Sequence, residues 1–345
     1  MTLIYFVLIL GTTVFIHELG HFLFAKKAKI YCYEFSLGMG PKLYSFRRKN
    51  DETEYSIRLF PIGGYVKMAG EEVEEDKEIR ADGRIQSKTF MQRFLTIVAG
   101  VTFNFLLGIV LLFFIGLIYG CPETKPYLGV VDKNYNAYKE GLRENDLILK
   151  VDNEKVYTWD DVLILLEMKD DTETLKLEYK NSNNEIKTIE IEPTKVDIDG
   201  STNYVYGISS TTKVNHGFIN SIKYASVKFA SIYKSMITVI TSLFTGKLGM
   251  DNLAGPVGIY GIVGEQAKVG FQNILYLISF LSINVGFVNL LPFPAFDGGR
   301  LVFLIIEKIR KKPVDSKIEN IIHAVGFILL MILMLIITIQ DIGRL

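Results

Sequence analysis

Four runs of apolar residues are each long enough to cross a membrane as a helix. They lie at residues 2–25, 94–119, 271–291 and 321–339. The first run has no basic residue before it and no small-residue cleavage pattern, which favours a retained helix over a signal peptide. Since about 20 apolar residues span the hydrocarbon layer, the pattern predicts a mainly α-helical membrane protein with four transmembrane helices.

A fifth segment, residues 218–244, is less apolar, because it carries Lys223, Lys228, Lys234 and several serines. This pattern is typical of an amphipathic helix at the membrane interface. Charge placement supports four spans. The loops that follow the first helix and precede the last one are both basic, so both should be cytoplasmic. A fifth span would put these loops on opposite faces, and we therefore predict that both termini are extracytoplasmic.

The polar stretch at residues 122–198 predicts a soluble α+β domain between the second and third spans. Strand-like runs occur at residues 127–131, 174–180 and 185–192, with a helical run at 159–168. The Gly-Leu-x-x-x-Asp-x-Ile turn at residues 141–148 resembles that of bacterial protease PDZ domains, with Asn145 at the position of the usual glycine. Asparagine tolerates the left-handed conformation that such a turn needs.

Composition narrows the function classes. Of the 345 residues, 49% are hydrophobic, which is typical of a membrane protein. The formal net charge is zero and the basic residues form no stripe, so we expect no nucleic-acid partner. Two cysteines, Cys32 and Cys121, are too few for a disulfide framework, and the predicted topology puts them on opposite sides of the membrane.

The first apolar run contains a His-Glu-x-x-His motif, formed by His17, Glu18 and His21. A charged residue at the centre of a membrane helix costs about 2.5–3.5 kcal/mol, so the motif needs a compensating partner. Residues four apart share a helix face, so both imidazoles could bind one zinc ion, with Glu18 beside them as general base. The alternative is a purely structural polar cluster between helices.

A catalytic zinc site usually has a third protein ligand and one open position. His216 and His323 lie in poor contexts, whereas Asp297 follows a helix that Pro292 and Pro294 must break. Irregular backbone at membrane depth occurs only where it is buried in protein or lines a wet cavity. Taken alone, Asp297 could equally belong to an ordinary surface turn. Because it lies on the same side of the membrane as the two histidines, we predict that it is the third ligand.

Two motifs resemble those of the site-2 protease family, the intramembrane zinc metalloproteases that include the bacterial regulator of sigma-E protease. They are the motif at residues 17–21 and Asn-x-x-Pro-x-Pro-x-x-Asp-Gly at residues 289–298, where Phe296 stands in place of the family's frequent leucine. Residues 63–68 resemble the membrane-associated β-loop of the family. Residues 99–105 resemble the second-span motif of the family, with Val101 where proline is common. Residues 255–259 resemble the family's segment before the third span.

The motifs and apolar runs together give a domain organisation of the single-PDZ type. In chain order we predict a first transmembrane helix with the zinc motif (1–25), a cytoplasmic-side membrane-associated β-hairpin region (26–93), a second transmembrane helix (94–119), a PDZ-like domain (122–198), a linker with the interfacial helix (199–270), a third transmembrane helix with the Asp-Gly motif (271–299), and a cytoplasmic loop with the fourth transmembrane helix (300–345).

The resemblance implies zinc-dependent cleavage of transmembrane segments in regulated intramembrane proteolysis, with anti-sigma factors or remnant signal peptides as substrates. Zinc on the three ligands would lower the pKa of a bound water, and Glu18 would accept its proton. We further expect Asn289 to hydrogen-bond the substrate backbone or the oxyanion. Gly64, Tyr65 and Val66 could offer an edge strand to an extended substrate, although this run could equally be a plain amphipathic surface hairpin.

Partners and location follow from the same pattern. We expect a multi-pass protein of the bacterial cytoplasmic membrane, in contact with lipid and with transmembrane substrates. The PDZ-like domain could bind a peptide C-terminus through residues 127–131, or could exclude substrates with bulky outer domains. The main alternative is a catalytically inactive PDZ-bearing membrane scaffold, and a weaker one is a metal transporter. A scaffold has no chemical need for Glu18.

Overall fold

The computed structural model describes residues 1–70, 79–170, 172–198, 201–249 and 253–344. It divides into two compact units. The first comprises Met1–Leu111 and Met250–Leu345, and the second comprises Leu112–Gly249.

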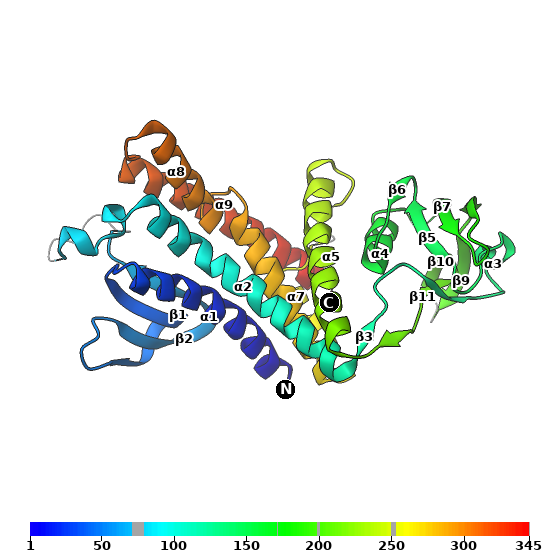
Figure 1. Ribbon diagram of the computed structural model, residues 1–345, viewed down its shortest axis with the longest axis horizontal. Coiled ribbons are helices and arrows are strands. Elements are labelled where there is room, and N and C mark those ends of the chain that lie inside the picture. Colours follow the sequence, from blue (N-terminus) through cyan, green and yellow to red (C-terminus); the bar gives the residue numbers. More distant parts are fainter. Residues whose placement is uncertain (71–78, 171, 199–200, 250–252, 345) are drawn as a thin grey trace. The chain divides into compact units, whose positions relative to one another are not determined.

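The first unit is built from helices that pack side by side, and four of those in the described residues are long and apolar (Figure 1). These are α1 (Thr2–Lys27), α2 (Phe90–Tyr119, which ends in the second unit), α6 (Pro256–Val269), α7 (Phe271–Leu290), α8 (Asp297–Arg310) and α9 (Ser316–Gly343). Helix α1 approaches α2 closely, since a Cβ atom at Gly20 would lie 2.5 Å from the Ala99 carbonyl oxygen. Small residues at such crossings let helix backbones meet in an apolar environment.

Helix α7 is held to α2 by hydrogen bonds between buried groups. Ser279 donates to the Gly108 carbonyl at 2.9 Å, and Ser282 donates to the Asn104 carbonyl at 3.0 Å. A polar group in an apolar bundle is costly unless it has a partner, so these bonds satisfy both serines. On its other side, α7 packs with α1 and α6 around Ile9, Val263 and Ile274.

Two long antiparallel strands, β1 (Cys32–Arg47) and β2 (Glu54–Met68), form the β-hairpin next to α1 (Figure 1). The first part of β1 pairs with both ends of β2, so that Phe35 lies opposite Val66 on one side and Tyr55 on the other. The hairpin therefore folds back on itself, and the stretch from Gly64 onward forms an edge of the sheet. Two 3₁₀ turns, η2 (Ala81–Gly83) and η3 (Ile85–Ser87), precede α2.

The second unit holds a four-stranded antiparallel sheet in the order β6-β5-β7-β8. Its elements, besides the end of α2, are β3 (Cys121–Pro122), β4 (Leu128–Val131), α3 (Asn136–Lys139), β5 (Leu147–Val151), β6 (Glu154–Lys155), α4 (Trp159–Glu167), β7 (Leu175–Lys180), β8 (Ile186–Ile191), β9 (Thr194–Ile198), β10 (Ser201–Val205), β11 (Ile208–Ser210), β12 (Val214–Asn215) and α5 (Phe218–Phe244). Fully buried Leu142, Ile148 and Leu177 belong to its core. Asn145 has a φ of 67°, the left-handed conformation expected in place of glycine.

Part of the predicted linker at residues 199–270 forms regular structure. Among its described residues, β11 pairs with β4, β12 pairs with β3, and residues 256–269 form α6. The soluble part therefore extends to Asn215, because its last short strands complete ladders begun near residue 121. The geometry disfavours the alternative in which residues 127–131 bind a peptide C-terminus, since β11 pairs with one edge of β4 and Leu128 donates to the Asp146 carbonyl on the other.

The four predicted apolar runs lie in α1, α2, α7 and α9. Within the described residues, five helices are long and apolar enough to cross a membrane, and the fifth is α5. Length and composition thus identify a multi-pass membrane protein without fixing the role of α5.

Candidate metal centre

Three predicted ligands meet in the first unit. His17 and His21 project from one face of α1, and Asp297 is the first residue of α8. The two Nε2 atoms are 3.1 Å apart, and Asp297 Oδ2 lies 3.2 Å from that of His17 and 3.1 Å from that of His21. Tetrahedral zinc with bonds of about 2.0 Å holds its ligand atoms roughly 3.3 Å apart. The triangle therefore has the size that a zinc ion requires.

The hydrogen bonding of His21 shows why a cation suits this triangle. Its Nδ1 lies 2.8 Å from the carbonyl oxygen of Thr96, and because a carbonyl only accepts, Nδ1 carries the proton. In the neutral imidazole, Nε2 then offers a lone pair toward the Asp297 carboxylate. Within the described residues, Asp297 Oδ2 is buried and accepts no hydrogen bond. A metal ion would satisfy these converging electron pairs.

The loop that delivers Asp297 is tightly packed. Helix α7 ends at Leu290, as the two prolines predict, and α8 begins six residues after Leu291. A Cβ atom at Gly298 would lie 2.1 Å from the Leu291 carbonyl oxygen, so only glycine fits after the aspartate. Ala295 adopts a positive φ of 84°, and its N–H donates to Nδ1 of His323 on α9 at 3.1 Å. His323, which lay in a poor context for a ligand, instead anchors this loop.

Helix α2 makes room for the two imidazoles. A Cβ atom at Gly100 would lie 2.3 Å from His21 Nε2 and 2.8 Å from His17 Cε1. Sequence reasoning assigned no direct role to Gly100 or Thr96, although Gly100 belongs to the stretch that resembles the second-span motif. Neither residue type suggests a metal site by itself, since their contribution depends on how α2 packs against α1.

A cavity of about 560 Å³ opens beside the ligand triangle. It is lined by His17, Glu18, His21, Tyr65, Val66, Lys67, Met68, Asn289, Ala295, Phe296, Asp297 and Arg300. Gly64 packs next to it, because a Cβ atom there would lie 3.3 Å from Glu18 Cγ. The structure thus brings the predicted base, the three predicted ligands and the predicted substrate-binding residues to one place.

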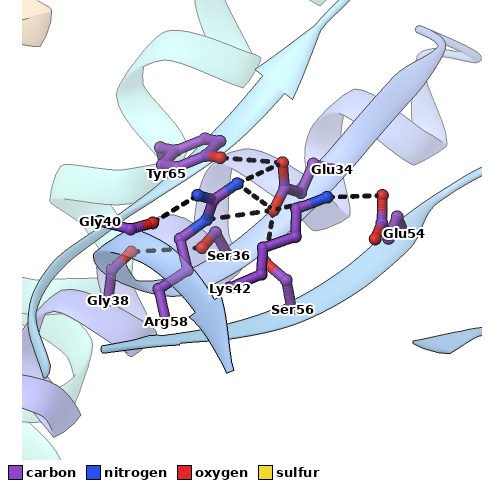
Figure 2. A network of polar contacts seen from close by, with 9 residues as sticks. All are labelled: Glu34, Ser36, Gly38, Gly40, Lys42, Glu54, Ser56, Arg58 and Tyr65. Carbon is purple, nitrogen blue, oxygen red and sulfur yellow. Dashed lines mark hydrogen bonds and ion pairs between the residues drawn. The ribbon is translucent and has the colours of Figure 1, made fainter. Parts of the chain in front are cut away.

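A buried carboxylate fixes the β2 segment that lines this cavity (Figure 2). Glu34 accepts hydrogen bonds from Ser56 at 2.5 Å, from Arg58 at 2.8 and 3.0 Å, and from the Tyr65 hydroxyl at 2.8 Å. Burial raises the pKa of Glu34, but the hydrogen bonds from Ser56, Arg58 and Tyr65 outweigh it and hold the pKa below its usual value. Glu34 therefore stays charged and ties β1 to Tyr65.

Comparisons with known proteins agree with this geometry. Peptidase family M50 matches residues 5–333 of the chain. The zinc metalloprotease RasP of Bacillus licheniformis is 36% identical, and the regulator of sigma-W protease RasP of Bacillus subtilis is 34% identical; both alignments cover 100% of this chain and 99% of the relative. A putative zinc metalloprotease of Fusobacterium nucleatum is 38% identical over the same shares.

The family match covers almost the whole chain and includes both halves of the ligand triangle. The relatives are named as zinc metalloproteases, and the described residues hold one triangle of the size that zinc needs. The chain therefore belongs to peptidase family M50, the site-2 proteases, and is a multi-pass membrane protein and a zinc metalloprotease.

Proposed function

We propose that this protease binds its zinc through His17, His21 and Asp297 and hydrolyses peptide bonds in transmembrane segments of other proteins, with Glu18 as the general base. The supporting observation is the triangle of two Nε2 atoms and one carboxylate oxygen, 3.1–3.2 Å apart, in a cavity that Glu18 also lines. The name of the sigma-W relative favours an anti-sigma factor as substrate. Remnant signal peptides are the second substrate class that we propose.

The residues divide the chemistry between them. Bound zinc would supply a Lewis acid that polarises the scissile carbonyl and acidifies water. Glu18 takes the proton of the attacking water and then gives it to the leaving amine. Asn289 lines the same cavity from the end of α7 and donates to the substrate backbone or to the oxyanion.

Replacement of Glu18 by glutamine tests the proposal. The Glu18→Gln variant should bind zinc like the parent but lose cleavage of a model transmembrane peptide, because the amide cannot take a proton. His17→Ala should lose both. Cleavage by Glu18→Gln at the parent rate would refute the role of Glu18, and zinc retained in full by His17→Ala would refute the ligand set. Zinc binding without cleavage in the parent itself would support the scaffold alternative.

The edge of β2 is the proposed substrate platform. Gly64, Tyr65 and Val66 pair with β1 on one side, and within the described residues no strand pairs with them on the other. Tyr65 and Val66 line the cavity of the metal centre. An unwound substrate segment could add to this edge by main-chain hydrogen bonds, which would hold its backbone extended beside Glu18.

For the soluble part we propose a PDZ-like domain that binds a free peptide C-terminus along β11 rather than along β4. A cavity of about 410 Å³ lies beside this strand, lined by Leu166 of α4 and by Ile208 and Ser209 of β11. Strand addition at such a groove is the usual PDZ mode. A peptide ending in a free carboxylate should bind more tightly than its amidated form, and Leu166→Asp should weaken that binding; equal binding of both peptides would contradict the proposal.

We also propose four spans, with both termini outside the bacterial cytoplasmic membrane and α5 outside the hydrocarbon layer. Near the middle of α5, Lys228 pairs with Asp160 at 2.8 Å, Ser231 donates to the same carboxylate at 2.7 Å, and Lys234 pairs with Asp161 at 2.8 Å. Both aspartates lie in the first turn of α4 in the soluble part. A helix whose central lysines form ion pairs with a water-exposed domain is poorly suited to cross a bilayer.

A further inference from the structure

Asn104 on α2 is a fully buried amide beside the metal centre. Its Nδ2 atom lies 3.3 Å from Nδ1 of His17, and its side chain has 0% exposure. Within the described residues, its Oδ1 atom is buried and has no hydrogen-bond partner. A buried acceptor without a donor is costly, and the two ends of an amide are distinguished only by the hydrogen bonds they make.

The state of His17 decides which end of the amide should face it. Its Nε2 atom is a corner of the ligand triangle and must offer a lone pair to the metal. In a neutral imidazole the proton is then on Nδ1, which needs an acceptor. The amide nitrogen is a donor and cannot serve, whereas a half-turn of the amide would place Oδ1 there.

We infer that Asn104 presents Oδ1 to the Nδ1–H of His17 and is the positioning residue that fixes the tautomer and orientation of this ligand. The inference rests on the proposed role of His17 in zinc binding. It gives each histidine an acceptor from the same helix, since the Thr96 carbonyl already receives Nδ1–H of His21. Thr96, Gly100 and Asn104 follow at four-residue intervals and so share one face of α2.

The packing of α7 holds Asn104 in place. Ser282 donates to the main-chain carbonyl of Asn104 at 3.0 Å, and a Cβ atom added at Gly286 would lie 3.3 Å from the Cβ of Asn104. The side chain therefore has little freedom to move away from His17. Acceptors of this kind raise the basicity of a metal-binding histidine, and their loss typically lowers metal affinity by roughly 10- to 100-fold.

The test is zinc affinity, measured by chelator competition on the full chain in detergent. Asn104→Leu keeps the approximate shape but removes the acceptor, so its zinc affinity should fall roughly 10- to 100-fold. Asn104→Asp keeps an acceptor and should bind zinc at least as tightly as the parent. Ser279→Ala, which removes the other buried serine hydrogen bond between α7 and α2 and does not touch Asn104, should bind zinc like the parent. If Asn104→Leu does not elute as a single folded species, Asn104→Ala replaces it.

The outcomes separate this inference from the proposed ligand set. Parent-like zinc affinity in Asn104→Leu would overturn the role of Asn104, and so would an equal loss in Asn104→Asp, because that would mark a purely steric effect. If instead His17→Ala also binds zinc as tightly as the parent, the ligand set itself is wrong. Weak binding in Asn104→Leu with rescue in Asn104→Asp supports the acceptor role.

Discussion

Gly100 is the residue whose side chain must be absent for the two imidazoles to fit. In Gly100→Ala the new methyl group would lie 2.3 Å from His21 Nε2, far inside contact distance. We expect this variant to lose zinc and cleavage together, as measured by metal content and a peptide assay. Gly11→Ala in α1 is the matched control, since a Cβ atom there meets nothing within 4 Å. Full zinc content in Gly100→Ala would contradict the packing.

Asn289 offers a second test among single residues. If its amide stabilises the oxyanion, Asn289→Ala should lower kcat by about 10²–10³ while zinc content stays unchanged. Asn273→Ala in the same helix is a suitable control. Asn273 lies at the opposite end of α7 from Asn289, where it donates a hydrogen bond to Gln266 of α6. Unaltered turnover in Asn289→Ala would remove Asn289 from the mechanism.

Site residues were predictable from the sequence where local spacing or a nearby motif marks them, and not where their role depends on packing between distant elements. His17, Glu18 and His21 were predictable because helical spacing alone brings them together, and Asp297 because two prolines mark its loop. Thr96, Gly100 and Asn104 were not, since their roles follow from the crossing of α1 and α2. His323 was missed for the same reason: it acts through a backbone N–H on another element.

Among the elements, the β-hairpin should depend on pH through Glu34. The pKa of Glu34 lies below the ordinary carboxyl value. The ion pair and hydrogen bonds of Glu34 therefore stabilise the hairpin in full at any pH above that ordinary value. This contribution should disappear as the pH falls through the lowered pKa. Thermal unfolding in detergent, followed from pH 7 downward, should show a falling midpoint in the parent. Glu34→Gln should unfold at a lower temperature at pH 7 and show a weaker dependence on pH; identical curves would contradict this role.

The edge of β2 can be tested by removing a main-chain donor. Val66→Pro should reduce proteolysis without loss of zinc, because proline cannot donate to an added strand and disturbs its neighbours. Tyr44→Pro is the control, since Tyr44 lies in the part of β1 that forms the opposite edge of the same sheet. Undiminished cleavage by Val66→Pro, or an equal effect of Tyr44→Pro, would argue against a substrate platform.

Elements differ in how far the sequence foretold them. The long helices were predictable because a bilayer demands about 20 consecutive apolar residues. The strands β11 and β12 were not, because they are only three and two residues long and pair with partners near residues 121–131. Helix α8 was also missed as an element, since it lies in a stretch expected to be a loop.

For the whole molecule, the proposed topology has four spans and keeps α5 out of the membrane. With four spans, the two termini lie on the same side, whereas a fifth span would separate them. Short peptide tags at the N- and C-termini, exposed to protease added outside intact cells, should both be removed. Removal of only one tag would show an odd number of spans and would contradict the proposed topology.

A direct measurement on α5 complements the tags. Ile237 is exposed on this helix, and a cysteine placed there, after replacement of Cys32 and Cys121, should react with a membrane-impermeant thiol reagent added outside. The reason is that α5 binds the soluble part through Asp160 and Asp161. Failure to react, with a cysteine at exposed Val130 as a reactive control, would place α5 in the bilayer.

The ligand triangle combines residues from near the two ends of the chain, so its members are synthesised at different times. Asp297 leaves the ribosome some 280 residues after His17, which takes roughly 15–55 s at 5–20 residues per second. Throughout that interval the nascent chain has Glu18 and both imidazoles but lacks the third proposed ligand. Proteolytic activity should therefore begin only near the end of translation, so that a half-made copy in the membrane is harmless to its neighbours.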